Sequence, residues 1–141
     1  MMGAITLNPI GILHCGLESR DATPRNYDVS QHRGTIEIYP QFRAALQGIC
    51  KGDTIVVLFW LDRADRTVLQ VHPRGDTSRP KRGVFSTRSP DRPNPIAVSE
   101  LLVEKIEDTV LSVKGVDILD NTPVIDIKSS IVSGRRKQQP G

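Results

Sequence analysis

Short runs of β-branched and aromatic residues follow one another along the chain, and turn-forming residues separate several of them. Residues 34–40 (GTIEIYP) alternate apolar and polar side chains with the period of a half-buried strand. Residues 53–61 (DTIVVLFWL) form an almost continuous apolar run, which predicts a central strand covered on both faces. The other strand candidates are residues 7–14, 67–71, 96–107, 109–116 and 123–128.

One segment, residues 40–49 (PQFRAALQGI), has a helical pattern. It begins with a proline suited to a first helical turn. Its apolar side chains recur at spacings of three and four, at Phe42, Ala45, Leu46 and Ile49. A chain of 141 residues suits one domain with a single core. We therefore predict a mainly β fold: a small single-domain β-barrel with one or two short helices and long functional loops.

The composition is that of an ordinary globular protein, with 38% hydrophobic and 25% charged residues. No apolar run approaches the roughly 20 residues that span a bilayer, and the start of the chain lacks signal-peptide features. We expect a cytoplasmic protein without a membrane partner. Cys15 and Cys50 lack paired spacing and are interpreted as structural free thiols. The three histidines are scattered, so no metal site is predicted.

The net charge of +3 equals the charge of Arg135, Arg136 and Lys137 near the C-terminus. Residues 134–141 (GRRKQQPG) have no apolar side chain to bury, which predicts a basic disordered tail after a domain spanning residues 1–133. Inside the domain, residues 63–92 hold an excess of arginine that suits a polyanion such as nucleic acid. The alternative is a solvated loop whose charges only maintain solubility.

The stretch GVFSTRSPDRPNPIAVS, residues 83–99, places Arg88, Arg92 and Asn94 among three prolines. Proline fixes φ and removes a backbone donor, so this stretch is predicted to be a rigid loop. Two long segments without a strand pattern, residues 18–33 and 73–94, are the natural places for a site. The chain has no GxGxxG, Walker or GxSxG motif, which argues against a Rossmann-type nucleotide-binding domain.

Together with GVDILDNTPVIDIK, residues 115–128, the proline-rich stretch resembles the TrmO-like family of methyltransferases, also called TsaA-like or YaeB-like. The usual family strings are close to GVFATRSPxRPNPIG and GLDxxDGTPVLDIKPY. The resemblance covers nearly the whole chain, because the IGIL, PRN, PQFRAALQGI and DTIVVLFW segments also follow the family order. It implies a compact β-barrel that forms a homodimer and binds S-adenosyl-L-methionine near the dimer interface.

The resemblance implies a reaction as well: methylation of N6 of the threonylcarbamoyl-modified adenosine 37 beside the anticodon of a tRNA substrate. The matching positions for cofactor binding are Pro24, Arg25, Asn26, Asp62, Arg63, Arg88, Val98, Lys114, Gly115, Val116 and Asp117. The chain departs from the usual residues at Asn26 (glutamine), Asp62 (histidine), Ala97 and Asn121 (glycine), and Ser129 and Ser130 (Pro-Tyr).

The chemistry of the cofactor suggests roles for some of these residues. Arg88 suits a two-pronged contact with a carboxylate, Asp117 can accept hydrogen bonds from ribose or ammonium, and Gly115 lets the backbone approach the adenine. Asp126 and Asp120 are the candidate proton acceptors, and either side chain has a structural alternative. Asp120 suits a turn, and Asp126 suits an ion pair. The candidate substrate-binding residues are Arg92, Asn94 and Lys128.

Two other functions stay open. Better-known bacterial members carry an additional C-terminal domain that helps to hold the tRNA, and this chain stops soon after the PVIDIK segment. One alternative is therefore an S-adenosyl-L-methionine-dependent methyltransferase of another RNA or a small molecule. The other is a non-catalytic RNA-binding or ligand-sensing module, for which the departures at Asn26 and Asp62 argue.

Overall fold

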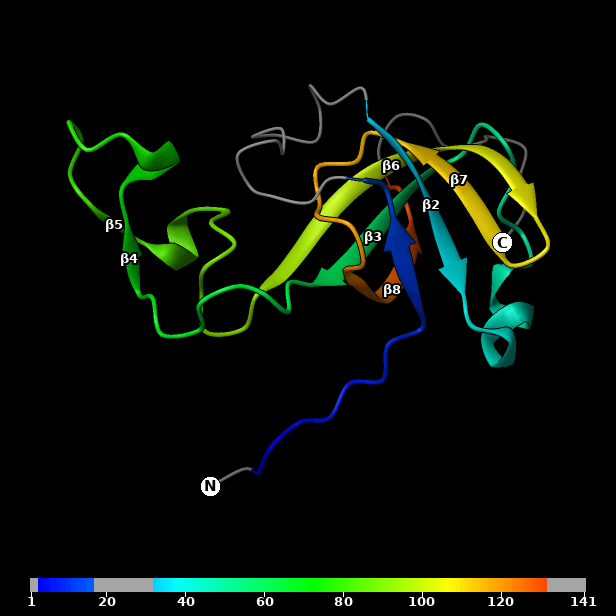
Figure 1. Cartoon of the computed structure of the whole chain (residues 1–141), viewed down its shortest axis with the longest axis horizontal. Helices are drawn as coiled ribbons and strands as arrows, with labels where there is room; N and C mark the ends of the chain where they lie inside the picture. The colour runs from blue at the N-terminus through cyan, green and yellow to red at the C-terminus, as the bar shows by residue number, and fades with distance from the viewer. Residues whose placement is uncertain (1–2, 17–31, 132–141) are drawn as a thin grey trace.

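The computed structural model describes residues 3–16 and 32–131, which form a closed β-barrel with a separate two-stranded sheet beside it (Figure 1). The barrel order is β1-β2-β7-β6-β3-β8, and each strand pairs antiparallel with both neighbours. The barrel strands are β1 (Gly11–His14), β2 (Arg33–Ile38), β3 (Thr54–Trp60), β6 (Ile96–Glu107), β7 (Val110–Lys114) and β8 (Pro123–Ser129). The predicted mainly β barrel is confirmed.

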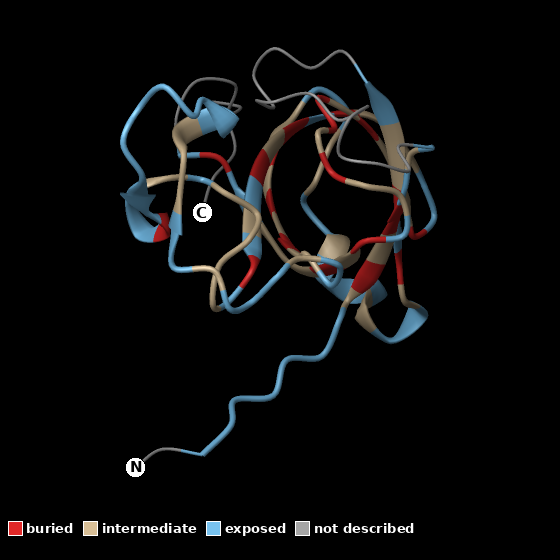
Figure 2. Cartoon of the chain, turned by 60° about the vertical axis from the view of Figure 1, so that its left-hand side comes forward, coloured by how far each residue is buried: buried red, intermediate tan, exposed pale blue. Residues whose placement is uncertain are grey.

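Side chains of alternate strand residues fill the barrel interior, as the buried segments around the ring in Figure 2 show. On β3, Ile55, Val57 and Phe59 are at most 2% exposed, and the residues between them are only half-buried. The expectation that β3 is covered on both faces is therefore wrong. A barrel strand has one face toward the core, and the apolar residues on the other face of β3 lie at the surface.

The predicted helix exists as the 3-10 helix η3 (Pro40–Leu46), with its proline in the first turn. Phe42 and Leu46, followed by Ile49, pack against the barrel core, as their spacing predicted. The strand expected at residues 67–71 is reduced to β4 (Gln70–Val71), which pairs with β5 (Arg82–Gly83) outside the barrel.

The chain leaves the barrel between β3 and β6 and returns to it after residues 62–95, which we call the arm (Figure 1). The arm contains β4, β5 and two short 3-10 helices, η4 (Pro73–Gly75) and η5 (Val84–Ser86). At its base, the amide of Leu61 donates to the carbonyl of Pro95 at 2.8 Å. No helix in the described part of the chain is long and apolar enough to cross a membrane.

Candidate functional site

A cleft with a volume of about 1660 Å³ separates the arm from one side of the barrel. Its barrel wall includes Val98 and Ser99 of β6 and the segment between β7 and β8, and its other wall belongs to the arm. Of the residues that the sequence analysis selected, the cleft is lined by Arg63, Arg88, Arg92, Asn94, Val98 and Asp117.

Arg92 clamps the proline-rich loop onto itself. Its Nη1 donates to the carbonyls of Thr87 and Ser89 at 3.1 and 3.0 Å, and its Nη2 donates to the carbonyl of Val84 at 3.0 Å. Arg92 was predicted to bind substrate. In the structure, its guanidinium donates three hydrogen bonds to backbone carbonyls of its own loop. The planar fork of arginine suits such a task because it presents several donors in fixed directions.

Arg88 connects the same loop to the barrel. Its Nη2 lies 2.5 Å from the carbonyl oxygen of Val98 on β6. The resemblance matched both Arg88, in the middle of the motif, and Val98, near its end, to cofactor binding. The structure brings these two residues into direct contact. The contact holds the Arg88 guanidinium at the cleft wall.

Asp117 presents its carboxylate to the cleft from the segment that follows β7. Its Oδ1 accepts a hydrogen bond at 3.0 Å from the hydroxyl of Ser99, which is 1% exposed.

The three residues before Asp117, which are Lys114, Gly115 and Val116, do not line the cleft. Gly115 adopts a φ of +105°, and the amides of Gly115 and Val116 donate to the carbonyl of His32 at 2.9 and 3.1 Å. Glycine is thus required here by the turn itself.

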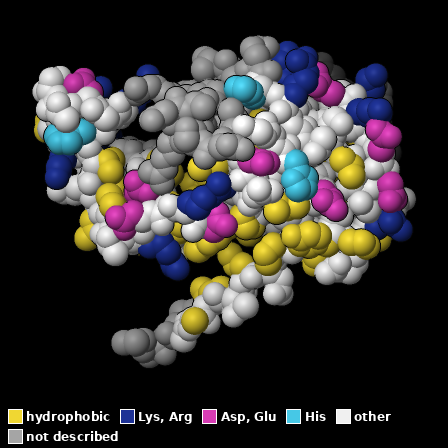
Figure 3. Space-filling model, in the orientation of Figure 1, with side chains coloured by type: hydrophobic (Ala, Val, Ile, Leu, Met, Phe, Trp, Pro, Cys, Tyr) yellow, Lys and Arg dark blue, Asp and Glu magenta, His cyan; other side chains and the backbone are white. Residues whose placement is uncertain are grey.

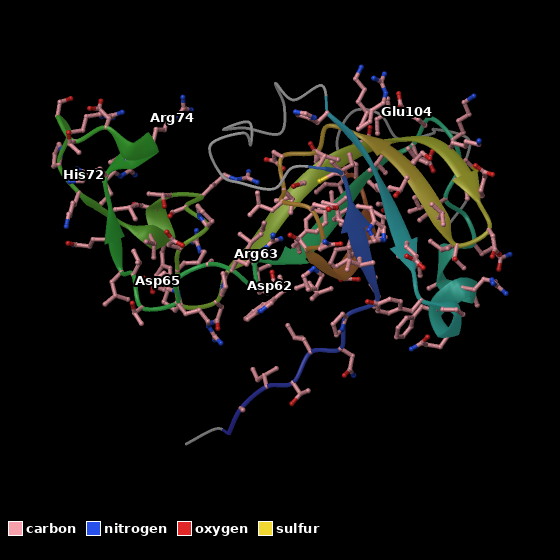
Figure 4. All side chains as sticks on the ribbon, in the orientation of Figure 1. Asp62, Arg63, Asp65, His72, Arg74 and Glu104 are labelled. Carbon is pink, nitrogen blue, oxygen red and sulfur yellow. The ribbon has the colours of Figure 1, made fainter. Side chains whose placement is uncertain are left out.

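Arg63 fastens the segment between β7 and β8 from the base of the arm. Its Nη2 donates to the carbonyl of Asp120 at 2.6 Å and to Oγ1 of Thr122 at 2.9 Å. The Asp62 carboxylate lies 3.5 Å from Nε of Arg63, and Figure 4 shows this pair where the arm meets the barrel. Asp62 does not line the cleft. It pairs with Arg63, which does line it.

Asp120 has the structural surroundings of a turn residue. Its Oδ1 accepts a hydrogen bond from the backbone amide of Cys15 at 2.9 Å. This bond lowers the pKa of Asp120 below its usual value of 3.8, with smaller contributions from the amides of Gly16 and Asn121. Asn121 follows at a φ of +62°, which is common for asparagine in turns. A carboxylate with a lowered pKa is a poor proton acceptor, so the structure favours the turn alternative.

Asp126 and Lys128 lie away from the cleft. They line a second pocket of about 500 Å³ beside η3, and Lys128 Nζ is 3.2 Å from Oδ2 of Asp126. The other carboxylate oxygen of Asp126 accepts a bond at 2.9 Å from the amide of Ile127. The structure therefore does not bring these two candidates to the residues around Arg88, and it shows the ion pair that the sequence left as an alternative.

Arg66 does not line the cleft but braces the loop beside it, and the sequence analysis did not select it. Its Nε donates to the carbonyl of Pro93 at 2.8 Å and its Nη2 to Oδ1 of Asn94 at 3.1 Å. The same guanidinium lies over the ring of Trp60, 5.1 Å from its centroid. Asn94, predicted to bind substrate, is thus partly occupied in bracing the arm.

Ser99 and Thr122 were missed too, because nothing in their local sequence marks them as partners of a distant carboxylate or guanidinium.

Pro24, Arg25 and Asn26 lie outside the described residues, as does the predicted tail at 134–141. Across residues 3–16 and 32–131, no group of three or more His, Cys, Asp or Glu side chains is arranged to hold a metal ion.

Relatives with known names resemble this chain over most of its length. The family described as tRNA-methyltransferase O N-terminal domain matches residues 12–133. A probable S-adenosyl-L-methionine-binding protein of Methanothermobacter thermautotrophicus is 43% identical over 125 residues, which is 88% of both chains. An S-adenosyl-L-methionine-binding protein of Archaeoglobus fulgidus is 39% identical over 122 residues, 86% of both chains.

Solved structures of TrmO have the same fold. The crystal structure of TrmO from Pseudomonas aeruginosa matches with a TM-score of 0.73 and 30% identity, over 99% of this chain and 64% of that one. A second TrmO crystal structure matches with a TM-score of 0.75 and 31% identity, over 96% of this chain. The chain spans 64% of the length of either TrmO chain. By sequence and by fold, it belongs to the tRNA-methyltransferase O N-terminal domain family.

Proposed function

We propose that this protein is an S-adenosyl-L-methionine-dependent methyltransferase that methylates N6 of threonylcarbamoyl-modified adenosine 37 in tRNA. The observation that carries the proposal is the convergence of Arg88, Val98 and Asp117 on one cleft. Arg88 and Val98 belong to one motif, whereas Asp117 comes from the separate segment after β7, and the family resemblance matches all three to cofactor binding. The names of the archaeal relatives, as S-adenosyl-L-methionine-binding proteins, support the same cofactor.

The side chains in the cleft fit the charged groups of this cofactor. The Arg88 guanidinium would hold the carboxylate, because its donors match two oxygens at once. The Asp117 carboxylate would accept hydrogen bonds from the ammonium or the ribose. A volume of about 1660 Å³ exceeds the usual range of small-molecule sites, roughly 300 to 1,000 Å³, so the cleft also has room for part of an acceptor.

When bound, S-adenosyl-L-methionine supplies a methyl group on a sulfonium that is already a good leaving group. The chain's own contribution is therefore mainly alignment of the two reactants. Arg92 and Arg66 stiffen the loop that carries Arg88, which limits the number of positions that Arg88 can adopt. Since Asp120 and Asp126 do not line the cleft, we expect the proton from N6 to leave to water.

We further propose that the protein works as a homodimer in the cytoplasm. On the outer face of the barrel, Leu58 pairs with Val98 and Trp60 pairs with Ile96 across β3 and β6. Val98 and Leu102 are 42% and 38% exposed, so this apolar face is open in a single chain. An exposed apolar face of this kind suits a self-complementary two-fold contact. Ile96 and Val98 also line the cleft, which puts the face beside the proposed cofactor site.

The test is methyl transfer by the purified protein. It is incubated with S-adenosyl-L-methionine and tRNA that carries threonylcarbamoyladenosine, and the digested nucleosides are analysed by mass spectrometry. We expect one additional methyl group, and fragmentation should assign it to N6. Matched tRNA without the threonylcarbamoyl group is the control for the acceptor. Methylation of both tRNAs at another position, or of neither, would contradict the proposed acceptor.

A second candidate is cofactor binding without methyl transfer. The names of the archaeal relatives favour it, since they describe binding and no reaction. The same incubation separates the two candidates when cofactor binding is measured beside it by calorimetry. Tight binding of S-adenosyl-L-methionine without transfer to tRNA or to small acceptors would favour the binding protein.

A further inference from the structure

The arm is strongly basic around its two-stranded sheet. Residues 72–88 include five arginine or lysine side chains and a single acidic one, Asp76. Oδ1 of Asp76 accepts bonds from the amide and hydroxyl of Ser78 at 3.0 and 2.6 Å. Among the described residues, the exposed side chains of Arg79, Lys81 and Arg82 form no ion pair. Their charge is therefore available to a partner.

The basic side chains are divided between two sides of the arm. Lys81 and Arg82 line the cleft, as does Arg74 on η4, whereas Arg79 does not. Figure 4 shows Arg74 far from the base of the arm, on the side of the arm that faces the barrel, and Figure 3 shows basic and acidic side chains on this part of the surface. The arm thus gives the cleft a positive wall opposite the barrel residues Ser99 and Asp117.

An exposed aromatic ring lies in the same wall. Phe85 is the middle residue of η5, which follows β5; it lines the cleft and is 82% exposed. The neighbouring Val84 is 2% exposed, so η5 is anchored through one side chain and presents the next. Aromatic rings beside cations are the usual means of holding unpaired nucleotides, because bases stack on the ring and phosphates contact the cations.

We propose that this cleft-facing wall of the arm, formed by Lys81, Arg82 and Phe85, binds a single-stranded loop of the RNA acceptor. Lys81 and Arg82 contact phosphates, and the Phe85 ring stacks on an unpaired base. This inference rests on the proposed function, because it assumes an RNA acceptor. It adds that the arm, within this chain, holds that acceptor against the cofactor side of the cleft.

The test compares two arginines on the same hairpin. Arg82→Gln and Arg79→Gln remove the same charge from exposed side chains, but only Arg82 lines the cleft. Binding of tRNA carrying threonylcarbamoyladenosine is measured by filter binding at several salt concentrations, with S-adenosylhomocysteine present. We expect Arg82→Gln to weaken binding about 3- to 10-fold and to reduce the slope of log K against log salt by about 0.7 to 0.9. Arg79→Gln should change the affinity less than 2-fold.

Phe85→Ala tests the stacking contact. We expect it to weaken RNA binding by about 5- to 100-fold without changing the salt slope, since stacking releases no counterions. Phe85→Leu should restore little of the loss, because an apolar side chain without a ring cannot replace a stacking surface. Thermal melting and cofactor titration confirm that each variant is folded and retains its cofactor site.

The outcomes separate this inference from the proposed function. If wild-type protein methylates the tRNA and the Arg82 and Arg79 variants bind it equally well, the arm wall is not the RNA surface, while the proposed function stands. Equal losses in both variants would indicate a diffuse charge effect and would also overturn the inference. If wild-type protein binds the cofactor but no RNA, the acceptor proposal is wrong and the arm inference is wrong with it.

Discussion

The hydroxyl of Ser99 and the carboxylate of Asp117 are joined by a hydrogen bond of 3.0 Å. Ser99 is buried within the longest barrel strand, so the bond ties a group in the cleft to a rigid part of the fold. A carboxylate that is held in one position loses less conformational entropy when it binds a ligand. The position of Asp117 therefore depends on the barrel as well as on its own loop.

Asp117→Asn should lower the affinity for S-adenosyl-L-methionine by about 10-fold or more, because a charged acceptor is replaced by a neutral amide. Ser99→Ala should give a smaller loss, of a few-fold, since the carboxylate remains but its anchor is gone. Calorimetric titration measures both variants, and thermal melting controls for folding. A larger loss in Ser99→Ala than in Asp117→Asn would contradict the assignment of Ser99 as a positioning residue.

Arg88→Lys should weaken cofactor binding by about 1 to 3 kcal/mol although the charge is kept, because lysine cannot reproduce a planar two-pronged contact. Arg43→Lys is the matched control: Arg43 lies on η3, pairs with Asp108 at 3.1 Å and does not line the cleft. It should bind the cofactor as wild type does. Unchanged affinity in Arg88→Lys would exclude the two-pronged contact.

Arg92→Lys should loosen the proline-rich loop, since one ammonium cannot serve the carbonyls of Val84, Thr87 and Ser89 together. We expect a loss of unfolding free energy of about 1 to 3 kcal/mol, measured by urea denaturation. Cofactor affinity should fall as well, because the loop carries Arg88. Wild-type stability and cofactor affinity, combined with impaired tRNA binding, would instead support the substrate-binding role expected from the sequence.

Asp120→Asn should destabilise the protein at neutral pH. The folded state lowers the pKa of Asp120 through the Cys15 amide, so this carboxylate stabilises the fold above its unfolded pKa. That contribution is lost as pH falls through the lowered folded pKa. The stability difference between wild type and variant should therefore be constant near neutrality and shrink below the usual value of 3.8. A difference that is independent of pH would show that the charge of Asp120 is not responsible.

Leu102→Glu tests the proposed dimer. Leu102 is exposed on β6 and lies opposite Thr54 on the outer face of the barrel. A buried charge there should shift the mass measured by light scattering from a dimer toward a monomer. Lys51→Glu, at an exposed turn, should leave the mass unchanged. A wild-type mass equal to one chain at all concentrations, with cofactor present, would contradict the homodimer.

Residues 96–107 were predicted as a strand with the bounds that β6 has in the structure. In the structure, buried Ser99, Leu101 and Val103 alternate with less buried residues of β6, and the pairing with β7 shifts its register between Val103 and Lys105. Residues 67–71 gave a weaker signal. Only Gln70 and Val71 form a strand there; the carbonyl of Leu69 accepts from the amide of Val84, but the Leu69 side chain is 66% exposed and has no core to cover.

The site could be predicted only in part. The prolines near Arg88 predicted a rigid loop. This could be inferred from the sequence because proline restricts the backbone of the residues next to it. The contacts Arg63–Thr122 and Ser99–Asp117 could not be predicted, because they join segments that meet only after the barrel register is set. For the same reason, the sequence could not show that Asp126 lies in a different pocket from Arg88.

The closure of the barrel by β1 and β8 also has a consequence for how the chain folds. Gly11 pairs with Val124, and the Cys15 amide reaches Asp120, so the first strand is completed by some of the last residues of the domain. Contacts so distant in sequence form slowly, because a long loop must close before they contribute. During synthesis, β1 and β8 cannot pair until β8 has left the ribosome. We therefore expect barrel closure to be a late step of folding, after β8 has left the ribosome, with β1 depending until then on its pairing with β2.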